Sequence, residues 1–332
     1  MLGAGGQCRH AADGRGYARE HVRRIHLDTD LGSDTDDLCA LAMLLGLPDV
    51  DVVGVTTVSD PGGIRAGMTR YALSLAGRDD VPVAAGAEGS LGGYFVPLEF
   101  PDYWPEPIRP APSRSGDALD LLGANIDAGA TVVSIGPYTN LALFEAARPG
   151  VLAGVPLAVM GGWVTPPGDG YPAWTWDQDF NVQQDAVAAQ VVFERCRPVV
   201  AQVSATLETF LRERDLALLD GAGPLARLIA AQARRRGEEY GMRDLPKDHP
   251  ALPDDLLNFQ YDPLACAVAC GWDGAVIEEV RVKPEIVGRR LRLPIVEKPV
   301  GIPMRVVMHA DGDRLARDWS DAVVRASARG AV

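Results

Sequence analysis

The sequence contains no apolar run approaching the roughly 18 residues that a transmembrane helix requires. Residues 1–24 are rich in Gly, Ala, Arg and His and lack the apolar core of a secretion signal. We interpret residues 1–24 as a flexible N-terminal extension and residues 25–332 as a single domain. These features predict a protein that has no membrane partner.

Cysteines are few and scattered. None of the five forms a Cys-x-x-Cys pair, which disfavours a zinc or redox site. Unclustered cysteines in a chain of this size are typical of a reducing compartment, so we predict a cytoplasmic location. The five residues are Cys8, Cys39, Cys196, Cys266 and Cys270.

Basic residues are outnumbered by acidic ones. The chain has 32 Lys and Arg against 45 Asp and Glu, and its formal net charge is −13. A surface of this sign repels phosphate backbones, so we expect no nucleic-acid partner. An acidic chain can instead concentrate carboxylates in one pocket, where they bind hard cations.

Strand-like and helix-like segments alternate along the chain. Strand patterns occur at Arg24–Thr29, Val50–Val58, Val81–Ala85, Thr131–Ile135, Val155–Met160 and Pro198–Val203. Helix patterns occur at Asp36–Leu47, Arg65–Ala76, Asn140–Ala147, Gln184–Glu194, Leu207–Leu219 and Leu225–Tyr240. This order predicts an α/β fold with a mainly parallel, open sheet covered by helices on both faces. Ligands of such sheets bind beyond the carboxyl ends of the strands.

Five aspartates lie within ten residues, directly after the first predicted strand. Like charges repel, so carboxylates at the end of a buried strand favour a bound cation that neutralises several oxygens at once. Capping of the following helix would explain one or two of them. The five residues are Asp28, Asp30, Asp34, Asp36 and Asp37.

Two other interpretations of this cluster are weaker. An EF-hand loop counted from Asp28 would need Gly and Glu where Ser33 and Cys39 stand. A phosphatase of the haloacid dehalogenase type also begins with Asp-x-Asp, but it needs a lysine in its phosphate site. The chain has three lysines, none at a convincing strand end or helix start: Lys247, Lys283 and Lys298.

The acidic cluster resembles the opening motif of the inosine-uridine nucleoside hydrolase family, Asp-x-Asp-x-Gly-x-Asp-Asp before an apolar helix. Asp28-Thr-Asp30-Leu-Gly32 matches its first half and Asp36-Asp37 matches its second half, with Asp34 and Thr35 as two additional residues. Further segments are similar to family motifs, in the expected order across about residues 24–310. They are Val53-Gly-Val-Thr-Thr-Val58, Ile135-Gly-Pro-Tyr-Thr-Asn-Leu141, Met160-Gly-Gly162, Asp179-Phe-Asn181 and Tyr261-Asp262-Pro263.

This resemblance implies an enzyme that hydrolyses the N-glycosidic bond of a ribonucleoside, using a water molecule bound to one Ca²⁺. The family's cation ligands fall on Asp30, Asp37, the backbone carbonyl of Ile135, and Asp262. These are hard oxygen donors, which calcium prefers. Asp30 is also the candidate catalytic base, which takes a proton from the water.

The resemblance also implies the contacts to the substrate. The transition state should resemble an oxocarbenium ion, so carboxylates and amides around the sugar stabilise it. Asp36, Asp179 and Asn181 would hold the ribose hydroxyls, and Met160 would belong to the same pocket. The two additional residues leave open whether Asp34 replaces Asp36 in this role.

Several departures from the family pattern concern the sugar and the base. Asp60 stands near the place of an asparagine that reaches the sugar, and it is either a sugar contact or a turn residue. Tyr261 stands where many members have the histidine that protonates the leaving base. A tyrosine can donate a proton, stack on the base, or pack beneath the pocket.

Two loops supply further candidates. His249 is either an alternative proton donor or simply solvated. Trp163, Trp174 and Trp176 lie in a Gly/Pro-rich segment and could stack on a base, with Trp176 as a candidate substrate contact.

The expected partner is a small-molecule nucleoside, and the resemblance implies a homodimer or homotetramer. Two alternatives remain at this stage. One is a hydrolase of the same fold that acts on a specialised N- or C-riboside. The other is a non-catalytic protein that binds nucleosides.

Overall fold

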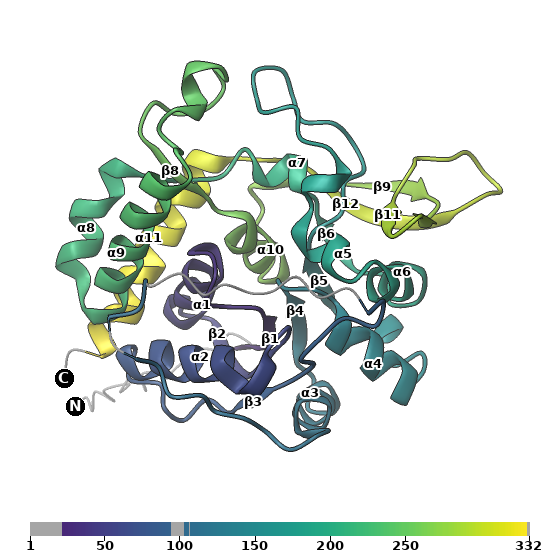
Figure 1. Ribbon diagram of the computed structural model, residues 1–332, viewed down its shortest axis with the longest axis horizontal. Coiled ribbons are helices and arrows are strands. Elements are labelled where there is room, and N and C mark those ends of the chain that lie inside the picture. Colours follow the sequence, from purple (N-terminus) through teal and green to yellow (C-terminus); the bar gives the residue numbers. More distant parts are fainter. Residues whose placement is uncertain (1–21, 94–102, 106, 331–332) are drawn as a thin grey trace, which may run out of the picture.

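A sheet of eight strands forms the centre of the computed structural model, which describes residues 22–93, 103–105 and 107–330 (Figure 1). The strands are β1 (Arg23–Thr29), β2 (Val50–Thr57), β3 (Val83–Ala85), β4 (Thr131–Ser134), β5 (Leu157–Met160), β6 (Val199–Ala201), β7 (Phe210–Arg212), β8 (Leu256–Phe259), β9 (Ala275–Val282), β10 (Glu285–Val287), β11 (Arg290–Arg292) and β12 (Ile302–Ala310). The large sheet has the order β3-β2-β1-β4-β5-β6-β12-β9, and its strands pair in parallel except at the β12–β9 edge. Strands β7–β8 and β10–β11 form two small antiparallel sheets.

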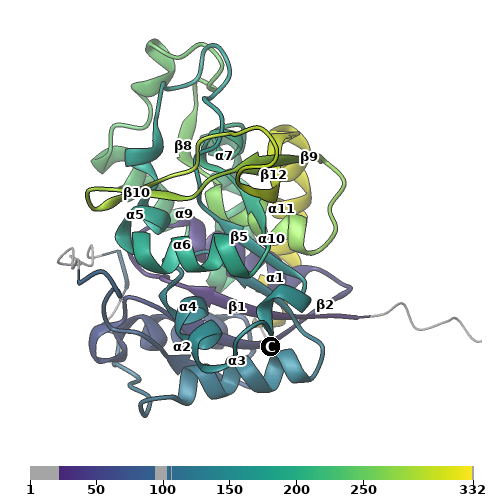
Figure 2. The same ribbon diagram turned by 90° about the vertical axis from the view of Figure 1, so that its right-hand side faces the viewer.

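Helices cover both faces of the sheet (Figures 1 and 2). They are α1 (Asp36–Gly46), α2 (Ile64–Leu75), α3 (Asp117–Asp127), α4 (Thr139–Ala147), α5 (Phe180–Gln184), α6 (Ala186–Arg195), α7 (Val203–Thr206), α8 (Leu216–Ala222), α9 (Pro224–Glu239), α10 (Tyr261–Ala269) and α11 (Gly312–Arg329). Helices α1, α2, α8–α11 share one apolar core, and α3, α4 and α6 share a second core on the other face. The sheet is therefore buried on both sides, which explains why β5 and β6 are wholly apolar and why the polar side chains of β1 from His26 onward are buried. The predicted α/β fold with a mainly parallel sheet is confirmed.

The turn between β1 and α1 carries the acidic cluster. Strand β1 ends at Thr29 and α1 begins at Asp36, so the aspartates lie at the carboxyl end of a central strand. Gly32 has φ 135°, a backbone conformation that residues with a side chain rarely adopt. The glycine therefore allows the tight turn between β1 and α1. The topology thus brings the cluster to the edge of the sheet where ligands of such folds bind.

The helix predicted over Leu207–Leu219 is wrong. This region instead contains strand β7, an irregular turn, and helix α8, which begins only at Leu216. Phe210 of β7 is paired with Phe259 of β8 and packs against its ring. Cross-strand pairing of this kind overrides a local helical pattern.

The helix predicted over Gln184–Glu194 is divided in two. Asp185 ends α5, and its side chain accepts a hydrogen bond from the backbone N–H of Ala188 to cap α6. The sequence pattern alone did not show that Asp185 caps a helix and does not lie inside one.

Most of the predicted N-terminal extension, residues 1–24, lies outside the described residues. Its last two residues, Arg23 and Arg24, belong to β1. None of the described helices is long and apolar enough to cross a bilayer.

Candidate active site

A cavity of about 530 Å³ opens where the parallel strands end. Its floor contains Asp30, Ile135, Met160 and Val203, which end or closely follow strands β1, β4, β5 and β6. This volume is typical of small-molecule sites, which occupy roughly 300–1,000 Å³. The prediction that the carboxyl ends of the strands carry the site therefore agrees with the geometry.

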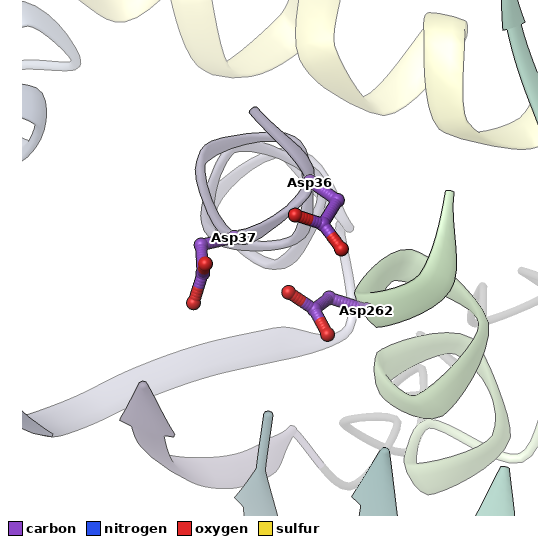
Figure 3. A group of neighbouring side chains, drawn as sticks. All are labelled: Asp36, Asp37 and Asp262. Carbon is purple, nitrogen blue, oxygen red and sulfur yellow. The ribbon is translucent and has the colours of Figure 1, made fainter. Parts of the chain in front are cut away.

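Three carboxylates converge on one point of this cavity. Asp36 and Asp37 begin α1, Asp262 lies in the first turn of α10, and one oxygen of each lies within 4.8 Å of the others (Figure 3). All three side chains are buried. Burial, followed by mutual repulsion, raises the pKa of the Asp262 carboxyl well above its usual value, and burial likewise raises those of Asp36 and Asp37. The repulsion among these three carboxylates is relieved when they bind either protons or a cation.

Asp30 lies in the same cavity but outside this group of three. One of its carboxylate oxygens lies 3.7 Å from Nη2 of Arg65, which is fully buried on α2. The same guanidinium donates to the carbonyl of Ser59 at 3.0 Å and to Oγ of Ser33 at 3.1 Å. Burial raises the pKa of Asp30, and Arg65 opposes this rise. Arg65 therefore supplies a permanent positive charge beside the predicted base.

The backbone carbonyl of Ile135 also belongs to the cavity. It accepts a hydrogen bond from Nδ2 of Asn181 at 2.8 Å, and the same amide lies 3.2 Å from the carbonyl of Met160. Asn181 thus ties the ends of β4 and β5 together beside the carboxylates. Ile135, Met160 and Asn181 all line the cavity, as predicted for site residues.

The donors present fit a hard divalent cation. Asp36, Asp37 and Asp262 offer carboxylate oxygens at one point, and Asp30 and Ile135 offer further oxygens in the same cavity. Oxygen-only ligands of this kind suit calcium or magnesium and do not suit zinc. Two predicted ligands, Asp37 and Asp262, lie in the convergent group, and Asp36, predicted to bind ribose, joins them.

Asp34 also lines the cavity but lies outside the group of three convergent carboxylates. It accepts hydrogen bonds from Arg236 of α9 and from Asn258 of β8, each at 2.8 Å. Asp36 joins the convergent group, whereas Asp34 binds Arg236 and Asn258. These contacts favour Asp36 for the role in the site, and the choice between the two residues remains a prediction.

Two predicted sugar contacts lie outside the cavity lining and act as helix caps. Asp60 accepts hydrogen bonds from the backbone N–H groups of Arg65 and Ala66 at the start of α2, at 2.7 and 3.0 Å. Asp179 accepts from the N–H of Gly162 at 2.6 Å and caps α5. Backbone donors occupy both carboxylates, which leaves them poorly placed to bind ribose directly.

Two predicted contacts to the base also lie outside the cavity lining. The ring of Trp176 is covered by the guanidinium of Arg292, 4.3 Å from its centre. His249 is half-buried in the loop before β8 and does not line the cavity. Trp174 lines it instead, and its ring is stacked with that of Tyr261 at 6.5 Å between centroids and 26° between planes.

Several residues that line the cavity were not predicted from the sequence. The main ones are Arg236 and Tyr240 at the end of α9, and Phe180 with Gln178 beside α5. The helical pattern of α9 indicated which face is apolar but not that its C-terminal turn reaches the site. Phe180 stands inside the Asp-Phe-Asn segment, which was the available signal for it.

Known proteins share this fold. A plant nucleoside hydrolase, PpNRh1, has a TM-score of 0.72 and 20% identity, covering 91% of this chain and 99% of its own. A purine-preferring ribonucleoside hydrolase from Gardnerella vaginalis has a TM-score of 0.70 and 22% identity, covering 92% and 99%. The pyrimidine-specific ribonucleoside hydrolase RihA of Salmonella paratyphi A is 29% identical over 253 residues, 70% of this chain and 79% of that protein.

The fold is therefore that of the nucleoside hydrolases. The family model described as inosine-uridine preferring nucleoside hydrolase matches residues 25–317. The chain belongs to this family, and it is an N-ribosyl hydrolase. The resemblance seen in the sequence motifs is confirmed.

We expect the stability of the protein to fall as pH rises through the titration of Asp179. Burial raises the pKa of this carboxyl from 3.8 to about 7, against the opposing hydrogen bonds from Val182 and Gly162. The folded state thus binds the proton more tightly than the unfolded chain. The stabilisation is complete below about pH 4 and is lost as pH rises through about 7.

Urea unfolding between pH 4 and 8 measures this effect. The carboxyl of Asp179 should contribute a negative slope of up to about 1.4 kcal/mol per pH unit in that window. Asp179→Asn should flatten the slope by this amount. An identical slope in the variant would contradict the assignment to Asp179.

Proposed function

We propose that the protein hydrolyses the N-glycosidic bond of ribonucleosides to ribose and a free base. The observation that carries this proposal is a buried cluster of carboxylates beside a stacked pair of aromatic rings in one cavity. Carboxylates suit a sugar that becomes positively charged in the transition state, and flat aromatic rings suit a planar base. Both parts are needed for cleavage of the bond that joins ribose and base.

Ca²⁺ is the cofactor that we propose for the convergent carboxylates. Asp36, Asp37 and Asp262 would hold it, with Asp30 and the carbonyl of Ile135 as further ligands from the same cavity. A bound divalent cation would supply Lewis acidity that makes a water molecule easier to deprotonate.

Asp30 is the base in the proposed reaction. The attacking water gives its proton to Asp30, its oxygen forms a bond to C1′ of the ribose, and the bond between C1′ and the base breaks. The remaining carboxylates stabilise the oxocarbenium character of the sugar. Asn181 orients the carbonyls of Ile135 and Met160 at the floor of the cavity.

Tyr261 serves better as a stacking residue than as a proton donor. Burial, Asp34 and Asp36 raise the pKa of its hydroxyl well above 10, which makes it a weak acid at neutral pH. We expect Tyr261→Phe to retain kcat within about threefold, since it preserves the ring that stacks on Trp174. A loss of 10²-fold or more, the scale of general acid catalysis, would assign proton donation to the hydroxyl.

Release of reducing sugar from inosine, guanosine, adenosine, uridine and cytidine tests the function. We expect release with Ca²⁺ and none with excess chelator. Absence of release from all five, with Ca²⁺ shown to be bound, would favour the alternative of a specialised N- or C-riboside, or a non-catalytic nucleoside-binding protein.

A homodimer or homotetramer in the cytoplasm remains our expectation for the assembly and its location. The hairpin β10–β11 and the segment after it expose Ile286, Val287 and Ile295, which suits contact with another copy. Sedimentation of the purified chain measures the oligomeric state.

A further inference from the structure

Asp34 joins three segments that are distant in the sequence. Its carboxylate accepts one hydrogen bond from Nη2 of Arg236 on α9 and one from Nδ2 of Asn258 on β8. The guanidinium carbon of Arg236 lies 3.6 Å from the centre of the Tyr240 ring. Arg236 is therefore held at one edge by a carboxylate and on one face by an aromatic ring, so its orientation in the cavity is fixed.

This guanidinium lies on the aromatic side of the cavity. Arg236 and Tyr240 line the same cavity as Trp174 and Tyr261. The ring of Tyr261 is in turn stacked with Trp174. A planar base that lies against these rings would present its edge to the N–H groups of Arg236.

The charges around Arg236 favour a neutral hydrogen-bond acceptor over an anion. Asp34 already neutralises Arg236, and the convergent carboxylates, with Asp30, add negative charge to the same cavity. A phosphate or carboxylate on the substrate would be repelled. The guanidinium offers instead a rigid fork of N–H donors, which matches two adjacent acceptor atoms.

We propose that Arg236 is a specificity-determining residue that selects ribosides of 6-oxopurines by donating hydrogen bonds to O6 and N7 of the base. This inference rests on the proposed function and names its substrate class. A 6-oxopurine presents O6 and N7 as adjacent acceptors, the pair that arginine binds in bidentate fashion. Adenine presents an amino donor beside N7, and uracil presents O4 without a second acceptor on that edge.

The same contact stabilises the base as it leaves. When the bond between C1′ and N9 breaks, its electron pair passes to the purine and negative charge spreads over the ring and O6. Arg236 donates hydrogen bonds to this charge without losing a proton, because a guanidinium keeps its positive charge in proteins. Water supplies the oxygen that binds C1′, its proton goes to Asp30, and the released base takes its proton from solvent.

Steady-state kinetics with inosine, guanosine, adenosine and uridine tests the selection. In the wild-type enzyme we expect kcat/KM for inosine and guanosine to exceed that for adenosine and uridine by about 10- to 100-fold. Arg236→Met should reduce this ratio to within about threefold, mainly by lowering the values for the 6-oxopurine ribosides. Arg227→Met, an exposed arginine on the same helix, is the matched control and should leave the ratio unchanged.

A base analogue that lacks N7 tests the proposed hydrogen bond from Arg236 to that atom. The wild-type protein should bind 7-deazahypoxanthine more weakly than hypoxanthine, whereas Arg236→Met should bind the two bases alike. A wild-type preference for adenosine or uridine, or an unchanged preference in Arg236→Met, would overturn the role of Arg236 while leaving the proposed function intact.

Calorimetry separates a failure of this inference from a failure of the proposed function. Hypoxanthine and adenine are titrated into the Ca²⁺-loaded wild-type and Arg236→Met proteins, which requires no turnover. Tighter binding of hypoxanthine that depends on Arg236 supports the inference even if no nucleoside is hydrolysed. Equal binding of the two bases by the wild-type protein overturns it.

Discussion

Asp262→Asn is expected to weaken cation binding and turnover strongly while making the cation-free protein more stable. Asp262 shares the convergent group with Asp36 and Asp37, so the change replaces one of three carboxylates at that point by a neutral amide. We expect the affinity for Ca²⁺ to fall by at least about 100-fold and kcat to fall with it. The cation-free protein should gain stability, because burial and two neighbouring carboxylates disfavour the charged form of Asp262.

Calorimetric titration with Ca²⁺ and thermal unfolding with and without chelator measure both effects. In the wild-type protein, Ca²⁺ at 100 times its Kd should add about 2.7 kcal/mol of stability. In Asp262→Asn this increment should disappear at the same concentration. Asp79→Asn, an exposed residue near β3, is the matched control. Retained Ca²⁺ stabilisation in Asp262→Asn would contradict the assignment of the cation to this group.

Asp30→Asn is expected to lower kcat by about 10²- to 10⁴-fold, the usual contribution of a catalytic base. The amide keeps the size of the side chain and an oxygen that faces Arg65, so the fold should be preserved. Since Asp30 lies outside the convergent group, Ca²⁺ affinity should fall less than in Asp262→Asn.

The comparison of these two variants separates the base from the cation ligands. Both are assayed with saturating inosine over a range of Ca²⁺ concentrations. If additional Ca²⁺ restores the activity of Asp30→Asn, the residue acts mainly as a ligand. If the loss persists at saturation, Asp30 acts on the water.

The motifs predicted the fold and several residues that share one cavity, and part of this has a physical reason. Asp36 and Asp37 follow β1, Ile135 follows β4 and Met160 ends β5, and parallel strands bring such positions to one edge of the sheet. Asp262 follows β8, outside the large sheet, and only the resemblance of the Tyr-Asp-Pro motif indicated it. The helix–strand order was visible because β2, β4, β5 and β6 are rich in apolar and β-branched residues.

The partners of the predicted aspartates could not be predicted in this way. Arg65 and Arg236 look like ordinary helical arginines in the sequence, and only tertiary packing shows that they contact Asp30 and Asp34. Asp60 has the residue type of a sugar ligand, but the N–H groups at the start of α2 use its oxygens. Whether a polar side chain can bind a substrate depends on which hydrogen-bond donors lie beside it in the folded structure. A local sequence pattern does not contain this information.

The helices and strands after Tyr240 were also not predicted from the sequence. The Tyr-Asp-Pro motif was the feature of this region that the sequence did indicate. Strands β9 and β12 form the antiparallel edge of the sheet, and exposed residues alternate with buried or partly buried ones along much of both strands, which weakens the apolar signal. Helix α11 packs against α1 through Trp319, whose indole donates to the carbonyl of Cys39. Such contacts join the two ends of the chain and have no local signature.

The fully buried Arg65 has a consequence for the order in which the enzyme is assembled. Because its guanidinium is always charged, part of the repulsion among the buried aspartates is offset by the chain itself. We therefore expect the polypeptide to reach its native topology before any ion binds, so that ion loading is a separate, later event. If so, the enzyme would lose and regain its ion without unfolding, and ion supply in the cell would set how many folded molecules are active.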